Sequence, residues 1–212
     1  MTASGRPAPS RPTLSRDYIA DAALSLIDAD GLRKFSMRRL GTALGFDPMA
    51  AYRYFPHQED LFDGVAAALF NEIDPDTLPW DGAWRALVEE YFTRLRDVLL
   101  RHPHAVTVFA TRPVRSTAAI DTGVRMLERL RDAGFPPPQA LRVVRCARDL
   151  TVGHALGVSV LRLGAASRSR RPAASSPEYN LLAEAADDTD IDDHFVLGLA
   201  ALLDGLAHLV RT

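Results

Sequence analysis

Cysteine and long apolar runs are nearly absent from this sequence of 212 residues. Its single cysteine, Cys146, excludes an internal disulfide and is typical of proteins that work in a reducing compartment. Cys146 stands among apolar helical positions, so we expect it to be a small buried residue. No apolar run approaches the roughly 18 residues of a membrane-spanning helix, and no signal-peptide pattern opens the chain. We therefore expect a cytoplasmic protein without a membrane partner.

Excess positive charge is also missing. The formal net charge is −2, with 25% charged and 47% hydrophobic residues, which is ordinary for a globular protein and excludes a general polyanion binder. Even residues 1–60 hold eight Lys or Arg against seven Asp or Glu. A DNA-binding segment with so little positive charge makes few phosphate contacts and needs a second copy to bind tightly. Any DNA binding therefore favours a homodimer on a palindromic site.

Recognisable catalytic and metal-binding motifs are missing as well. The chain has no phosphate-cradling glycine loop, no nucleophile-elbow serine and no zinc-type His-Glu-x-x-His. His102 and His104 flank a proline, but no Cys, Asp or Glu stands beside them at ligand spacing. We therefore expect no enzyme activity, no metal and no cofactor. The alternation typical of β-strands is absent too, so the expected fold class is all-α.

Two short helix signals separated by a glycine-bearing turn occupy residues 36–55. Ser36 is a suitable N-cap for the first helix, and Gly45 stands where a helix C-terminus favours a left-handed residue. Asp47 can cap the next helix, with Pro48 at its first position. This is the layout of a helix-turn-helix DNA reader, although an ordinary helical hairpin has the same local pattern.

Amphipathic segments on both sides favour the DNA reader. We expect one helix from Ser15 to Asp30 and another from about Gln58 to Phe70. The second reader helix starts with small and apolar residues, which suit base edges and thymine methyl groups, while nearby arginine and tyrosine side chains can reach phosphates. The expected DNA-contacting residues are Arg38, Arg39, Pro48, Met49, Ala50, Tyr52, Arg53, Tyr54 and Gln58.

The sequence divides into a tail, a head and a larger helical region. Residues 1–13 are rich in proline and hold almost nothing to bury, so we expect a disordered tail. A DNA-binding domain is expected at residues 14–74, and a helical-bundle domain for ligand binding and dimerisation at 75–212. A flexible loop, rich first in arginine and then in acidic residues, is expected at about 164–189. The longest helices of the bundle are expected at about 80–102, 139–163 and 192–211.

Several short motifs stand at fixed offsets within residues 14–70. They are Ala22-Ala23-Leu24-Ser25-Leu26-Ile27, Ser36-Met37-Arg38-Arg39-Leu40, Leu44-Gly45, Tyr52-Arg53-Tyr54-Phe55 and Asp60-Leu61. Together they resemble the N-terminal signature of the TetR family of bacterial repressors. The resemblance implies a three-helix DNA-binding domain that a fourth helix tethers to a helical ligand-binding and dimerisation domain. Where the family often has a lysine that touches a phosphate, this chain has Gln58.

A second set of motifs lies at residues 80–163. It comprises Leu100-Arg101-His102-Pro103, Ala110-Thr111-Arg112-Pro113 and Thr151-Val152-Gly153. These residues are similar to the C-terminal domain of the tetracycline-repressor branch of the family. The similarity implies that the helix from Gln139 and the terminal helix form a four-helix dimer bundle, and that a ligand cavity lies between the fourth to eighth helices. The leucine stripe expected at the centre of the dimer interface is Leu199, Leu202 and Leu206.

The ligand cavity implied by this similarity is expected to be largely apolar. In tetracycline-responsive members a histidine two positions before the Gly/Ala-Thr-Arg-Pro motif helps to hold magnesium, and we assign Phe109 to its place. Gly157 and Asp74 stand at two further places of that site, so magnesium–tetracycline is not the expected ligand. The expected ligand-binding residues are Phe92, Phe109, Leu127 and His154, with His154 as the orienting hydrogen-bond group. A structural role for His154, or a place in the dimer seam, remains the alternative.

These features predict a homodimeric TetR-like transcriptional regulator. The expected mode is repression, with a small apolar or aromatic effector that releases the protein from palindromic operator DNA. The effector acts only through a difference in its affinity for two states of the protein. A helical protein-interaction module that no longer binds DNA is the alternative function, and an enzyme without a recognisable motif is a more remote one.

Overall fold

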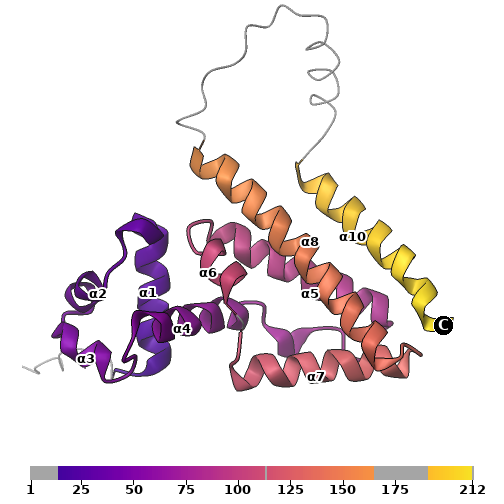
Figure 1. The fold of residues 1–212 in the computed structure, drawn as a ribbon, viewed down its shortest axis with the longest axis horizontal. Coiled ribbons are helices and arrows are strands. Elements are labelled where there is room, and N and C mark those ends of the chain that lie inside the picture. Colours follow the sequence, from indigo (N-terminus) through magenta and orange to yellow (C-terminus); the bar gives the residue numbers. More distant parts are fainter. Residues whose placement is uncertain (1–13, 113, 165–190, 212) are drawn as a thin grey trace, which may run out of the picture.

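The computed structural model describes residues 14–112, 114–164 and 191–211, and all regular elements within these ranges are helical. Three helices form a head at one end (Figure 1): α1 (Arg16–Asp30), α2 (Met37–Leu44) and α3 (Pro48–Tyr52). From the head, α4 (Gln58–Asn71) leads into a larger body. The body contains α5 (Trp84–Arg101), α6 (Val106–Thr111), α7 (Thr117–Asp132), α8 (Pro137–Gly164) and α10 (Ile191–Ala207).

The all-α fold class is confirmed, with short 3-10 turns at Leu32–Lys34, Pro75–Thr77 and His208–Arg211. The tail expected at residues 1–13 lies outside the described residues, as do residues 165–189 of the expected loop. Gly164, the first residue of that loop, instead ends α8.

The reader helices begin and end where the sequence indicates. The Ser36 hydroxyl accepts from the Arg39 N–H at 3.3 Å, which satisfies one of the free donors at the start of α2. Gly45 ends α2 in the left-handed region, with φ 67° and ψ 25°. The carboxylate of Asp47 then accepts from the Met49 N–H at 2.9 Å. The turn is therefore set by local side-chain and backbone chemistry.

The start of α5 differs from the expectation. We expected the helix from residue 80, but it begins at Trp84. A turn closed by the Gly82 N–H on the Pro79 carbonyl, at 3.0 Å, precedes it. Trp80 is buried in the connection before the helix, where its indole N–H donates to the Pro75 carbonyl at 2.8 Å. Its apolar character thus reflects burial in a loop and not a position on the helical stripe.

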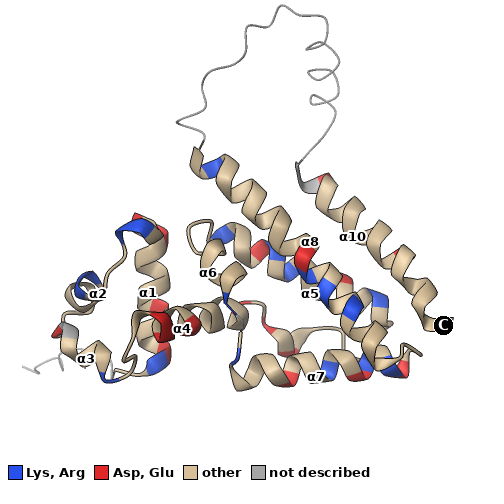
Figure 2. Ribbon diagram, viewed as in Figure 1, with Lys and Arg blue, Asp and Glu red and all other residues tan. Residues whose placement is uncertain are grey.

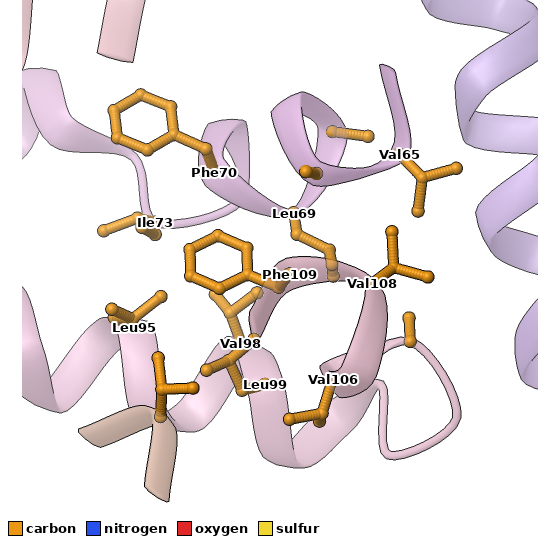
Figure 3. Packing of buried hydrophobic residues seen from close by; sticks show 14 of the residues in the cluster. Val65, Leu69, Phe70, Ile73, Leu95, Val98, Leu99, Val106, Val108 and Phe109 are labelled. Carbon is orange, nitrogen blue, oxygen red and sulfur yellow. The ribbon is translucent and has the colours of Figure 1, made fainter. Parts of the chain in front are cut away.

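The C-terminal half of α4 is part of the body core. Figure 3 shows the Phe109 ring of α6 lying among residues of α4 and α5, with Leu69 and Leu95 on its two sides. Phe70 follows on α4, and it is 3% exposed. Because α4 also packs along α1 of the head, it belongs to both parts of the protein. α4 therefore connects the core of the body to the head.

Helices α8 and α10 lie side by side along one edge of the body (Figure 1). With 28 residues, α8 is about 42 Å long at 1.5 Å per residue. α10 turns Phe195, Leu199 and Leu203 inward, each at most 3% exposed. The prediction that Leu199 is central to a dimer interface is therefore wrong, because this side chain fills the core of its own protomer. Leu202 and Leu206 are partly buried against the same core.

Two further expectations need correction. Cys146 is exposed on α8 and is not a buried core residue. α10 also provides an apolar stretch that the sequence reading missed: Asp193–Val210 is 18 residues long with a mean hydropathy of 1.4, which by length and composition alone is enough to cross a membrane. Only 17% of that stretch is buried in one protomer. Packing on α8 explains the apolar character of its inner side.

Candidate DNA-reading surface and effector cavity

The exposed surface of the head centres on the start of α3. Met49 is 65% exposed and Tyr52 is 38% exposed, both unusually open for large side chains. Arg38 on α2 is also exposed, and within the described part of the chain its guanidinium has no hydrogen bond or ion pair. Arg53 and Gln58 are exposed at the end of α3 and the start of α4. These side chains are available to an external partner.

Two of the expected DNA contacts are used within the protein. Arg39 pairs with Asp30 at 2.5 Å and donates to the Lys34 carbonyl at 3.1 Å, so it ties α2 to the end of α1. The Tyr54 hydroxyl donates to the Leu14 carbonyl at 2.9 Å. Its proton is therefore not available to a phosphate, and the expectation for Tyr54 is replaced by a role in holding the start of α1.

The two smaller residues of the expected set occupy the beginning of α3. Pro48 is the first residue of the helix, as expected from its missing N–H. Ala50 is half-buried, and Ala51 beside it is 3% exposed in the head core. The short helix thus packs through Ala51 and presents Met49 outward.

A cavity of about 570 Å³ opens in the body between α4, α5, α6 and α8. This volume is within the roughly 300–1,000 Å³ range of pockets for drug-sized ligands. Its lining combines aromatic and aliphatic residues with three arginines and one aspartate. The lining residues are Phe70, Tyr91, Phe92, Leu95, Phe109, Arg112, Val114, Ala119, Val144, Arg145, Arg148 and Asp149.

Only part of the expected ligand set lines this cavity. Phe92 and Phe109 do so, whereas Leu127 and His154 do not. Leu127 packs against the core from α7. His154 faces α10, with its ring centroid 5.3 Å from that of Phe195. The expectation that His154 orients the ligand is therefore wrong for this cavity: the side chain contacts the neighbouring helix of its own protomer.

The place of the magnesium-holding histidine also needs a correction. Counting back two residues from Ala110 leads to Val108 and not to Phe109. Both Val108 and Phe109 are buried and apolar, at 3% and 4% exposure, and neither carries an imidazole. In the described part of the chain, no group of three or more His, Cys, Asp or Glu side chains is arranged to hold a metal ion.

The polar side of the cavity was largely missed in the sequence. Tyr91, Arg145 and Arg148 line it, and they come from two helices that meet only in the folded chain. Burial raises the pKa of the Tyr91 phenol to about 12, against the opposing effect of the Arg148 charge. Tyr91 is therefore a neutral hydrogen-bond donor at physiological pH. Helical spacing alone does not show which way each of these side chains points.

Arg112, at the end of α6, joins the cavity to the head. It lines the cavity and forms ion pairs with Glu59 and with Asp63, the latter at 3.1 Å. Its guanidinium also donates to the Glu59 carbonyl at 3.1 Å and lies 5.8 Å from the centre of the Phe62 ring. All three partners belong to α4. Arg112 thus connects the cavity to the helix that carries the head.

A second junction lies at the other end of α4. His102, just after α5, contacts Asp28 of α1 at 2.6 Å and Glu72 after α4 at 3.0 Å. The hydrogen bond with Asp28 raises the pKa of His102, and the contact with Glu72 adds to this against the effect of burial. Burial alone would raise the pKa of Glu72, but His102 and Arg101 lower it. The cluster favours a protonated imidazole between two carboxylates.

The outer face of α8 and α10 is apolar and open. We use this name for Val160, Leu161 and Leu163 of α8 with Val196 and Leu197 of α10, which are 47–71% exposed. Figure 2 shows α10 almost free of Lys, Arg, Asp and Glu along its length. An added Cβ at Gly153 or Gly157 of α8 would meet nothing within 4 Å. Exposed apolar surface on two adjacent helices is typical of an interface with a partner.

Comparison with known proteins identifies both parts of the chain. Residues 19–65 match the family described as bacterial regulatory proteins, tetR family, and residues 77–210 match the tetracyclin repressor-like, C-terminal domain. An HTH-type transcriptional regulator of Saccharopolyspora erythraea is 30% identical over 207 residues, covering 93% of this chain and 86% of that protein. The HTH-type transcriptional repressor DrrR1 of Streptomyces coeruleorubidus is 29% identical, with coverage of 94% and 80%.

Solved structures agree with these matches. The Streptomyces coelicolor TetR family protein ActR, in complex with actinorhodin, is similar with a TM-score of 0.77 at 25% identity, covering 95% of this chain and all of that one. TetR-family regulators bind operator DNA and small-molecule effectors and act as dimers. The chain therefore belongs to the tetR family of bacterial regulatory proteins and is a DNA-binding transcriptional regulator.

Proposed function

We propose that this protein is a homodimeric repressor that a small aromatic effector releases from a palindromic operator. Arg38 reads a base edge, Tyr52 donates to a phosphate, and Met49 packs against the groove floor. The support is the exposure of these three side chains around the start of α3. Arg53, Gln58, Pro48 and Ala50 belong to the same surface.

The observation that carries the effector response is the position of α4. Its Phe70 forms part of the cavity wall, and its Glu59 and Asp63 are held by the cavity residue Arg112. A molecule that fills the cavity therefore contacts the helix on which the head is mounted. The effector changes operator affinity by favouring one position of α4 over another.

The geometry of a palindromic operator explains why such a change matters. Two heads must enter successive major grooves about one helical turn, roughly 34–36 Å, apart or a multiple of it. A shift of α4 in each protomer changes this separation without any direct contact between effector and DNA. Operator affinity then falls because both heads cannot fit at once.

We propose that the dimer forms through the outer face of α8 and α10. Leu197 is 71% exposed and Val196 is 60% exposed, and both point away from the protomer core. The small residues Gly153 and Gly157 allow close approach of a second helix. This surface replaces the set expected from the sequence, in which Leu199 was central.

The proposed effector binds without magnesium. We propose that the protein acts in the cytoplasm as a binding protein and not as an enzyme. The cavity wall of Phe70, Phe92 and Phe109 suits an aromatic body, since ligand pockets are mainly apolar with a few placed polar groups. The similar protein ActR forms a complex with actinorhodin. For this chain, the support for an aromatic effector is the set of phenylalanines that line the cavity.

A gel-shift assay with the DNA upstream of the protein's own gene tests the proposal. We expect a shifted complex that Arg38→Ala and Tyr52→Phe weaken, whereas Arg131→Ala, an exposed arginine on α7 far from the head, leaves it unchanged. A protein that binds no DNA fragment from its own genome would instead support a helical interaction module and would contradict the repressor.

A further inference from the structure

The polar side of the cavity carries a surplus of positive charge. Three arginines line it, Arg112, Arg145 and Arg148, against a single acid, Asp149. Arg112 already has two carboxylate partners on α4, so it contributes little free charge. The two cavity-lining arginines of α8, Arg145 and Arg148, decide what the cavity can hold.

Neither of these two cavity-lining arginines is neutralised by the described part of the protein. Within the described residues, Arg145 has no hydrogen bond or ion pair. Arg148 contacts only Asp149, its neighbour in sequence, at 3.3 Å, and the Asp149 side chain is 74% exposed. Adjacent residues on a helix do not face each other, so this pair leaves most donors of the guanidinium unused.

Tyr91 supplies a third donor. It lines the cavity from α5, and Arg148 is close enough for its charge to act on the phenol. Tyr91 is half-buried, and its hydroxyl oxygen is not among the buried side-chain atoms that lack a hydrogen-bond partner within the described residues. The phenol O–H is a donor that a ligand acceptor in the cavity can use.

Three phenylalanines also line the cavity: Phe70 of α4, Phe92 of α5 and Phe109 of α6. We propose that the effector is an aromatic carboxylic acid whose ring system lies against these phenylalanines and whose carboxylate is bound by Arg145 and Arg148, with Tyr91 donating a third hydrogen bond. This rests on the proposed effector function of the cavity and specifies its chemical class.

The geometry of the donors favours a carboxylate over the alternatives. Guanidinium groups match planar carboxylates with parallel N–H donors, and such charge-assisted bonds are stronger than neutral ones. A cationic ligand would face two unneutralised arginines with only the outward-turned Asp149 as a partner. A neutral aromatic ligand would gain no charge-assisted hydrogen bond from Arg145 or Arg148, whose donors water satisfies because Arg145 is exposed and the Arg148 side chain is 41% exposed.

The test uses matched acids and amides as probes. Naphthalene-2-carboxylic acid and anthracene-2-carboxylic acid, each paired with its primary amide, are titrated into the full-length protein by calorimetry or ligand fluorescence. The acid and the amide have nearly the same shape, so the ratio of their dissociation constants isolates the charge. We expect the acid to bind about 10-fold to 100-fold more tightly than the amide, as typical for hydrogen bonds to a charged group.

Variants then assign the preference to the cavity. The double variant Arg145→Gln, Arg148→Gln should lose the preference for the acid, and Tyr91→Phe should reduce it. Arg142→Gln is the matched control, because Arg142 is an exposed arginine of the same helix that does not line the cavity. It should keep the full preference. Circular dichroism confirms that each variant remains helical.

The inference is overturned if acid and amide bind equally, if neither binds, or if the double variant keeps the preference. These results are separate from the gel-shift assay of the repressor. A protein that shifts its upstream DNA but does not favour the acids is a regulator with a different class of effector. A protein that favours the acids but shifts no DNA retains the ligand class and contradicts the repressor.

Discussion

Replacing Arg112 with methionine should weaken operator binding although the residue lies in the body. Methionine keeps most of the length of the side chain but removes its charge and donors. Two ion pairs with exposed carboxylates contribute about 0.2–1 kcal/mol each, and the bond to the Glu59 carbonyl adds about 1 kcal/mol. The contacts with α4 thus total about 1–3 kcal/mol. If they hold α4 in its DNA-binding position, Arg112→Met should reduce operator affinity by about 5-fold to 100-fold.

Fluorescence anisotropy with the labelled upstream fragment measures this change, without effector. Arg131→Met is the matched control, since its only ion pair within the described residues is with the adjacent Asp132 at 3.4 Å. The control should bind with wild-type affinity. The reasoning is refuted if Arg112→Met remains folded and binds the operator as tightly as the wild type, because the Arg112 contacts would then make no contribution to the position of the head.

Four further outcomes are expected. Asp28 and Glu72 raise the pKa of His102 above its usual 6.5. The stability that this cluster contributes is therefore complete below about pH 6.5 and is lost as the pH rises through the folded-state pKa. Melting temperatures at pH 6 and pH 9 should differ less in His102→Gln than in the wild type. Arg38→Ala should reduce the difference in binding free energy between the operator and an operator mutated at one base pair by about 1–3 kcal/mol, as measured by competition. Equal weakening on all sequences would make Arg38 a phosphate contact instead. Leu197→Arg should give folded monomers by ultracentrifugation, and a dimer of unchanged affinity would contradict the proposed interface. Leu199→Ala, a change in the protomer core, should instead lower the free energy of unfolding by about 2–5 kcal/mol. Tetracycline with magnesium should leave the operator complex intact in a gel shift, and release at micromolar concentration would show that other oxygen atoms hold the metal.

The local structure of the head could be predicted because its signals act over short distances. A hydroxyl or carboxylate cap bonds an N–H two or three residues away, as Ser36 and Asp47 do. Gly45 ends α2 in the left-handed conformation, which glycine adopts without the steric cost of a side chain. By contrast, the Tyr54 hydroxyl bonds Leu14, 40 residues away, and no local pattern indicates that contact.

The orientation of residues on the body helices could be predicted only in part. A helix has several apolar sides when it packs against more than one neighbour, so a stripe of leucines does not show which side faces the core. On α10 the sequence analysis chose Leu199 for the dimer interface, whereas the protomer core takes this residue and leaves Leu197 outside. The same ambiguity placed His154 in the cavity, although it faces Phe195.

The sequence by itself determined the all-α class, the helix-turn-helix and the family, because caps, turns and helical periodicity are local properties of the chain. Only the tertiary structure decided the cavity and its links to the head. Arg112 meets Asp63 across 49 residues, and His102 meets Asp28 across 74, through the packing of separate helices. Tyr91 and Arg148 likewise share one cavity because α5 and α8 lie side by side. Such contacts depend on how whole helices are placed in space, and the spacing of residues within one helix carries no information about that placement.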